Sequence, residues 1–213
     1  METKKSDEIN VTQAYSKGWD VMSGNFGILL LIILISSLLA ALSGNYYHGE
    51  KESLGILRSL FWLFISIPVS FGTHWVFLKA ARKEPFQIQD MFSAFSTKYW
   101  NVVLAGFLVT IISIVGFIML IIPGIIVVVR LVFVPYLVMD RQMKALEAID
   151  ESWKMTKGYF WTIFFTGLLS IFIGLAGILM LIIGIFPALI WIYGTFASLY
   201  DMIDNKTPKI ISI

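Results

Sequence analysis

The chain has 213 residues, of which 58% are hydrophobic and only 14% are charged, with a formal net charge of +2. Soluble domains carry about 25% charged residues. The lower charged fraction of this chain and its mean hydropathy of +0.82 together exclude an ordinary soluble protein. The absence of cysteine excludes disulfides, thiol nucleophiles and thiolate metal sites. We therefore expect one membrane domain over residues 1–213, with no separate soluble part and no cleaved signal peptide.

Six long apolar stretches dominate the chain, and each approaches the roughly 20 residues that a membrane-crossing helix needs. They predict an all-α polytopic membrane protein with spans at about 26–42, 56–78, 100–121, 123–139, 160–183 and 187–200. Pro123 and Pro187 fit the first turns of the fourth and sixth spans, where a proline breaks no hydrogen bond. Pro68 and Pro135 lie deeper, so they should kink their helices and free backbone carbonyls.

The basic residues predict the orientation of the spans. With the N-terminus in the cytoplasm, the cytoplasmic side receives almost all lysines and arginines, and the other side receives only Lys51 and Arg58. Cytoplasmic loops of membrane proteins carry this excess of positive charge. Both termini, including the short tails 1–10 and 205–213, are therefore expected in the cytoplasm.

Three short amphipathic segments precede the first, third and fifth spans, and they suggest an internal repeat. Their apolar residues recur at steps of three and four, which is typical of a helix lying at a membrane surface. Ala14, Trp19, Gly24 and Phe26 also match Ala148, Trp153, Gly158 and Phe160, each 134 residues later. We predict three parallel repeats of amphipathic helix plus helical hairpin, at about 11–80, 86–140 and 142–204.

Arg130 is the clearest candidate for a functional residue because it is the one charge within its apolar stretch, 100–139. A charge in the membrane centre costs about 2.5–3.5 kcal/mol or more, so Arg130 needs a compensating environment. Two interpretations stay open: a structural role on freed carbonyls or helix ends, or binding of an anionic headgroup or substrate. Asp201 is the nearest acidic candidate in the chain, but its predicted depth argues against a pair with Arg130.

Two further residues are candidates for ligand contacts. His74 lies within the second stretch near Ser70 and Thr73, and it fits either a proton relay or a hydrogen-bonded interior histidine. Tyr136, close to Arg130 in sequence, fits either a ligand hydrogen bond or a residue of the aromatic belt at the membrane surface. No phosphate loop, His-Glu-x-x-His zinc motif or Gly-x-Ser-x-Gly nucleophile motif is present, and His48 with Glu50 and Glu52 fits a solvated outer loop better than a weak divalent-ion site. We therefore predict no enzyme, no cofactor, no metal and no nucleic-acid partner.

The segments Ile122-Pro123-Gly124-Ile125 and 148–158, together with Arg130 and Leu199-Tyr200-Asp201, resemble a prokaryotic family of six-span membrane proteins of unknown function. That family is similar to the membrane domain of glycerophosphodiester phosphodiesterases. The resemblance implies a prokaryotic plasma (inner) membrane protein with six helices, and it supplies no established activity. The first hairpin, with its longer loop, departs most from the family pattern.

These observations lead to two hypotheses about function. The first is a non-enzymatic protein that binds or moves a lipid-like or amphipathic anionic molecule, with Arg130 as the anion anchor and His74 and Tyr136 as further contacts. The alternative is a structural or regulatory subunit of a membrane transporter or membrane-stress system, docking through the amphipathic segments. Expected partners are membrane lipids, including anionic ones, and a membrane protein or a second copy of this chain.

Overall fold

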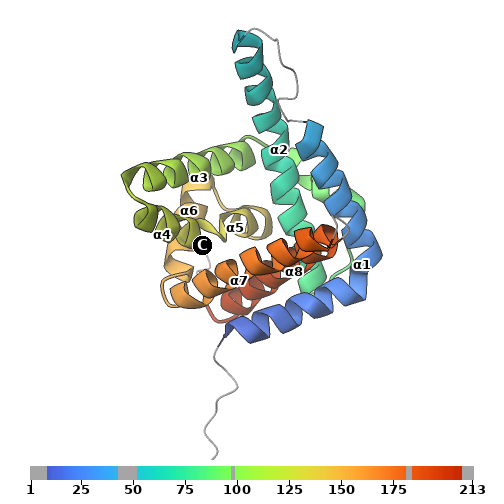
Figure 1. Cartoon of the computed structure of the whole chain (residues 1–213). Helices are drawn as coiled ribbons and strands as arrows, with labels where there is room; N and C mark the ends of the chain where they lie inside the picture. The colour runs from blue at the N-terminus through green and yellow to red at the C-terminus, as the bar shows by residue number, and fades with distance from the viewer. Residues whose placement is uncertain (1–8, 43–51, 97–98, 181–183, 208–213) are drawn as a thin grey trace, which may run out of the picture.

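A computed structural model describes residues 9–42, 52–96, 99–180 and 184–207; for residues 42 and 52–62 it describes the helix alone. Within these residues the chain forms helices and short turns with no β-strand, which confirms the all-α fold class. In chain order the elements are α1 (Val11–Leu42), α2 (Glu52–Ala81), the 3-10 helix η1 (Ile88–Phe95), α3 (Tyr99–Met119), α4 (Ile121–Leu131), α5 (Val134–Asp140), α6 (Ala145–Met155), α7 (Phe160–Leu179) and α8 (Ile185–Asp204) (Figure 1).

The described residues contain six helical segments that are long and apolar enough to cross a membrane. They follow one another as three pairs: α1 with α2, α3 with α4–α5, and α7 with α8. The most apolar windows of the second members are 56%, 44% and 50% buried, against 17%, 28% and 17% for the first members. The helices α2, α4–α5 and α8 therefore form the inside of the protein, and α1, α3 and α7 present apolar faces outward.

The fourth predicted span is interrupted rather than continuous. Helix α4 ends at Leu131, and α5 begins at Val134 with Pro135 in its first turn. Proline has no N–H, and its ring clashes with the carbonyl four residues earlier, so the expected kink becomes a break. The prediction that Pro123 belongs to the first turn of α4 is confirmed, and the helix begins after Leu120, whose backbone is extended.

Pro68 has the predicted effect inside α2. A proline at this position cannot donate to the carbonyl of Phe64, four residues earlier. That freed oxygen accepts a hydrogen bond of 3.1 Å from the Tyr99 hydroxyl at the start of α3. The hydrogen bond that is missing within α2 at Pro68 is thus replaced by a hydrogen bond to the neighbouring helix α3.

Helix α1 contains both the first amphipathic segment and the first span, with a bend at Asn25 (φ −136°, ψ 26°) (Figure 1). The junction before α7 has almost the same conformation at Tyr159 (φ −119°, ψ 16°), which is 134 residues later. The preceding Gly24 and Gly158 are also alike, because a Cβ on either would meet no atom within 4 Å. The threefold duplication stays a prediction, and these matched junctions support it.

Each amphipathic segment packs against the second helix of a pair. The first half of α1 crosses α8 so closely that a Cβ on Gly18 would lie 2.7 Å from the backbone nitrogen of Thr195. η1 crosses α2 even more closely, since a Cβ on Gly72 would overlap the carbonyl oxygen of Met91. Helix α6 packs against α4 and α5. Each of the three segments thus covers part of an inner helix.

The outward faces of these segments carry large apolar side chains. Trp19, Phe92, Leu146 and Trp153 are 51%, 41%, 68% and 42% exposed. In α6 the inward face buries Glu151 and Ser152 among two alanines and Met155, and the outward face carries charged side chains beside its large apolar ones. Exposed tryptophan and leucine on a short amphipathic helix suit contact with lipid at a membrane surface.

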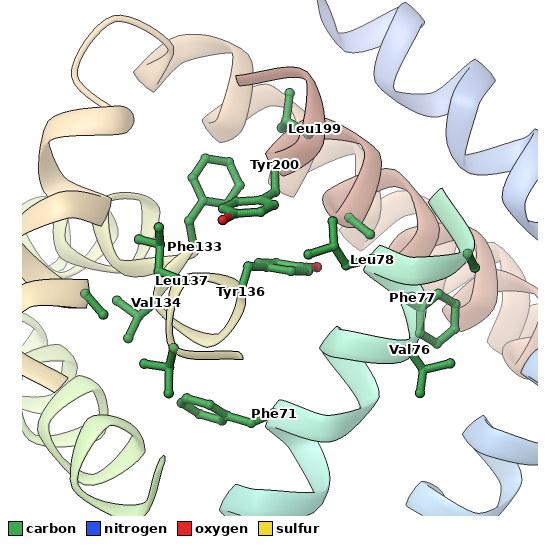
Figure 2. Packing of buried hydrophobic residues seen from close by; sticks show 14 of the residues in the cluster. Phe71, Val76, Phe77, Leu78, Phe133, Val134, Tyr136, Leu137, Leu199 and Tyr200 are labelled. Carbon is green, nitrogen blue, oxygen red and sulfur yellow. The ribbon is translucent and has the colours of Figure 1, made fainter. Parts of the chain in front are cut away.

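The centre of the core lies between the three inner helices. Tyr136 of α5 stacks on Tyr200 of α8, with ring centroids 5.0 Å apart and an interplanar angle of 15°. Figure 2 shows this pair beside Phe133 and facing Leu78 of α2. Tyr136 is completely buried, so its interpretation as a belt residue at the membrane surface is wrong.

Candidate ligand-binding sites

Arg130 is the penultimate residue of α4, and it lies against the C-terminal end of α6. Its guanidinium carbon is 5.7 Å from the ring centroid of Trp153 and 5.4 Å from that of Phe160. Its Nη1 is 3.5 Å from the Trp153 carbonyl oxygen and 3.5 Å from Thr156 Oγ1. Aromatic faces and helix C-termini both attract a cation, so dipoles and π faces surround this charge.

The hydrogen-bonding capacity of Arg130 is mostly unused in the described structure. A guanidinium has five N–H donors, and the two contacts of Nη1 are at the outer limit for hydrogen bonds. Its Nε is buried with no hydrogen-bond partner among the described residues. The backbone is held firmly, because the buried Ser152 hydroxyl donates to the Arg130 carbonyl at 2.7 Å. The backbone of Arg130 is therefore fixed in place, and most N–H donors of its side chain have no close acceptor among the described residues.

The expected lack of an Arg130–Asp201 pair is confirmed. Asp201 instead accepts a hydrogen bond of 2.9 Å from Nε of Arg82. Within the described ranges, no ion pair includes Arg130. The contacts with α6 match the structural interpretation of Arg130, and its unused donors match the anion-binding one.

His74 and Tyr136 lie together in the core. The Nδ1–H of His74 donates to the Ser70 carbonyl oxygen at 2.7 Å, and its ring is 5.1 Å from those of both Tyr136 and Tyr193. The buried hydroxyl of Tyr136 has no hydrogen-bond partner among the described residues. In this part of the chain no contact joins Arg130 to His74 or Tyr136, so the three predicted residues form two separate sites.

A network of ion pairs joins the ends of the three inner helices. Arg82, directly after α2, donates to both carboxylate oxygens of Asp140 at 2.6 and 2.8 Å. It also contacts Asp201 and, at 3.4 Å, Asp204. The Tyr200 hydroxyl donates to Asp140 at 3.1 Å. One guanidinium thus connects α2, α5 and α8.

Arg141, directly after α5, makes the second set of links in this network. Its Nε and Nη2 donate to Asp204 Oδ1 at 3.0 and 2.6 Å, and its Nη1 donates to Glu151 of α6 at 3.1 Å. The Asp204 side chain is only 2% exposed. Removing either arginine would leave buried carboxylates without a counter-charge, which is energetically costly.

The pKa values of both arginines reflect these partners. Burial lowers the pKa of Arg82, but hydrogen bonds and attraction from Asp140 and Asp201 outweigh it, so its pKa lies above the ordinary guanidinium value. The pKa of Arg141 is raised in the same way, since Asp204 outweighs the effect of burial. Both guanidinium groups therefore stay charged.

Arg82 and Arg141 occupy equivalent positions in successive hairpins. Each follows the last residue of an inner helix and binds the last residue of the next one, Asp140 or Asp204. The residues after them, Lys83 and Gln142, both have a left-handed backbone with φ of 58° and 50°, a common way to end a helix. This correspondence supports the predicted duplication independently of the 134-residue match.

Sequence reasoning missed this network. It treated Arg82 and Arg141 as charges that set orientation and considered Asp201 as a partner for Arg130 alone. The available signal was the position of both arginines directly after an apolar stretch, with aspartates at the ends of the fourth and sixth stretches. Which carboxylate meets which arginine depends on helices far apart in the chain.

In the described part of the chain, no three histidine, aspartate or glutamate side chains are arranged to hold a metal ion. The buried charges pair with each other, apart from Arg130, which contacts dipoles and aromatic rings. Together with the six long apolar helices, these features define an α-helical multi-pass membrane protein.

Comparison with protein-family models, with curated proteins and with solved structures finds no match to this chain. The resemblance to a six-span prokaryotic family therefore stays an expectation from the motifs.

Proposed function

We propose that this protein is a non-enzymatic membrane protein that binds an anionic, lipid-like molecule at Arg130. The proposal rests on a difference in hydrogen-bond partners between Arg130 and two other arginines. Arg82 and Arg141 have their donors occupied by carboxylates, whereas Arg130 has a buried Nε without a partner in the described structure. A phosphate or carboxylate group would supply the missing acceptors, because it matches the planar donor fork of arginine.

The surroundings of Arg130 fit an amphipathic ligand. Trp153 is 42% exposed, and the neighbouring Trp161 is 65% exposed, so apolar rings border the guanidinium on the outer surface of the protein. A lipid could place its headgroup at Arg130 and its chains along these aromatic side chains. We further propose a plasma membrane location with both chain ends in the cytoplasm, which would place α6 and this site near the cytoplasmic surface.

Native mass spectrometry of the purified protein in mild detergent, with added phosphatidylglycerol, tests this function. Arg130→Ala should lose most of the bound lipid, and Arg130→Lys should retain part of it because lysine keeps the charge without the planar fork. Lys157→Ala is the matched control, since Lys157 is exposed near the end of α6 and should leave binding unchanged.

The structural interpretation of Arg130 gives a different result in the same experiment. If Arg130 serves only to bind α4 to the C-terminus of α6, Arg130→Ala should lower the melting temperature and leave the lipid content unchanged. That result would contradict lipid binding at this site. Recovery of a stoichiometric protein partner instead of lipid would favour the alternative role as a subunit of a larger membrane complex.

A further inference from the structure

A cavity of about 410 Å³ lies among α1, α2, α3 and α8, away from Arg130. Its wall includes Leu39 and Ala40 near the end of α1, so it lies toward the side of the structure where α1 ends. Six hydroxyl-bearing side chains from four helices line it: Ser36, Ser66, Ser70, Thr73, Thr110 and Tyr193. Its volume falls in the range of about 300–1,000 Å³ that is usual for small-molecule sites.

The hydroxyl groups of the cavity offer both donors and acceptors. Thr110 donates its hydroxyl hydrogen to the Gly106 carbonyl, and Thr73 donates to the Val69 carbonyl, so both oxygens can still accept. Because the Thr73 hydrogen is used in this way, Ser36 donates to Thr73 Oγ1 at 3.0 Å and keeps accepting capacity only. The hydroxyl groups of Ser66, Ser70 and Tyr193 in the lining carry donor hydrogens as well. A ligand with hydroxyl or amide groups could use both kinds of partner.

The mouth of the cavity is polar at a place where the chain is otherwise apolar. Ser66, Ser70 and Thr110 are exposed there, although they belong to helices long and apolar enough to cross a membrane. In hydrocarbon an exposed hydroxyl group can bond only to its own helix, as Thr110 does to Gly106, and its remaining hydrogen-bonding capacity would stay unused, which is unfavourable. Their convergence on one cavity indicates that water or a polar molecule reaches them.

The chemistry of the cavity lining indicates an uncharged ligand. None of the described residues that line it is charged, and an ion in a low-dielectric site without a counter-charge is strongly disfavoured. On the core side of the cavity, the His74 ring donates a hydrogen bond of 2.7 Å to the Ser70 carbonyl oxygen and packs edge-on against Tyr193. These contacts fix the inner end of the cavity on the core.

We propose that this cavity is a second, water-accessible binding site, specific for a small uncharged molecule that carries several hydroxyl or amide groups. The site is separate from Arg130 and does not depend on lipid binding there. Tyr193 and Thr73 bind the ligand at the inner end, and Ser66, Ser70 and Thr110 bind it at the mouth.

Cysteine labelling tests the proposal in the full-length protein in liposomes, because the natural chain has no cysteine. Ser70→Cys and Thr110→Cys should react with a small water-soluble thiol reagent about tenfold faster than the controls, since thiolate forms only where water is present. The controls, Leu38→Cys and Ile111→Cys, replace apolar side chains that are 62% and 40% exposed on the same helices as Ser36 and Thr110. Equal rates at all four positions would show that lipid fills the cavity, and the proposal would be wrong.

Protection by a ligand tests the specificity of the cavity. Glycerol should slow the labelling of Ser70→Cys in a saturable way, by about twofold at a concentration equal to its dissociation constant. Choline at the same concentrations should have no effect, because its charge has no partner in the lining. Adding Tyr193→Phe should weaken the protection and leave unprotected labelling fast. Fast labelling without saturable protection by glycerol would overturn the assignment of a ligand, because the cavity would then hold water alone.

Discussion

Arg82 and Asp140 form a bidentate ion pair, with two N–O distances of 2.6 and 2.8 Å, between residues that end successive inner helices. Arg141 and Asp204 form the corresponding pair at the next inner helix, in which two guanidinium nitrogens donate to one carboxylate oxygen. In a membrane protein the hydrophobic effect does little to hold helices together, so packing and polar contacts between helices carry more of the stability. These pairs therefore set the arrangement of the three hairpins.

Replacing Arg82 by methionine should destabilise the protein by about 3–5 kcal/mol, because it leaves carboxylates with little solvent contact and no counter-charge. The fall in melting temperature in detergent measures this loss. Lys154→Met is the control, since Lys154 pairs with Asp150 in an exposed setting where both side chains are more than 60% accessible (62% and 66%). It should cause no measurable change, and similar effects from the two variants would contradict a special role for the network.

The double variant Arg82→Met with Asp140→Leu should be more stable than Arg82→Met alone. Removing the unpaired carboxylate removes the cost of its burial, and apolar replacements of buried pairs are often tolerated. The comparison is a thermal unfolding series of the two single variants and the double variant. Additive losses would show that the two side chains do not act on each other.

Gly72→Ala should destabilise the packing of η1 on α2 by about 1–3 kcal/mol or more through overpacking, because the added Cβ would overlap a backbone oxygen. Gly167→Ala in α7 is the matched control, where a Cβ meets nothing within 4 Å. Alanine there should stabilise the helix by about 0.5–1 kcal/mol. Opposite shifts in melting temperature are expected, and shifts of the same sign would contradict the close crossing at Gly72.

Tyr99→Phe should cost about 0.5–1.5 kcal/mol by removing the hydrogen bond to the carbonyl that Pro68 leaves free. In a Pro68→Ala background the cost should be smaller, because alanine restores the N–H that the Phe64 carbonyl lacks. A double-mutant cycle on unfolding free energies measures the coupling. An equal cost of Tyr99→Phe in both backgrounds would show that Pro68 is not the reason for the bond.

The orientation of the spans is tested by single cysteines in whole cells. Ser6→Cys, Ser96→Cys and Thr207→Cys should be protected from a membrane-impermeant thiol reagent, and Ser53→Cys should react. This expectation rests on the excess of basic residues in the loops and tails that are predicted to be cytoplasmic. Labelling of Ser96→Cys from outside would overturn the six-span topology.

The glycines of α7 show which packing contacts local sequence can and cannot predict. Helix α7 contains three glycines, Gly167, Gly174 and Gly177, and each could allow a neighbouring helix to approach closely. Only Gly177 is such a packing position, since a Cβ there would lie 2.8 Å from the Gly184 carbonyl oxygen, whereas the other two meet open space. A glycine in an apolar helix allows close approach, but the position of the neighbouring helix decides whether an approach occurs.

The properties that depend on local chemistry could be predicted from the sequence. These are the all-α class, the six apolar spans, a distortion of the helix at Pro135 (although its extent was not predicted), the carbonyl freed by Pro68 and the lack of a nearby acid for Arg130. Each follows from the length of an apolar stretch or the covalent structure of one residue, without knowledge of its neighbours in space.

Which distant side chains meet depends on the tertiary structure. Arg130 contacts Trp153 and Phe160 because α4 packs against α6 and α7. Arg82 contacts Asp140 and Asp201 because the inner helices end on the same side of the structure. The pairing of charges depends on how three hairpins pack together, and the aligned repeat gives no partner for a given residue. The hydroxyl-lined cavity has the same origin, since its walls come from four helices that lie far apart along the chain.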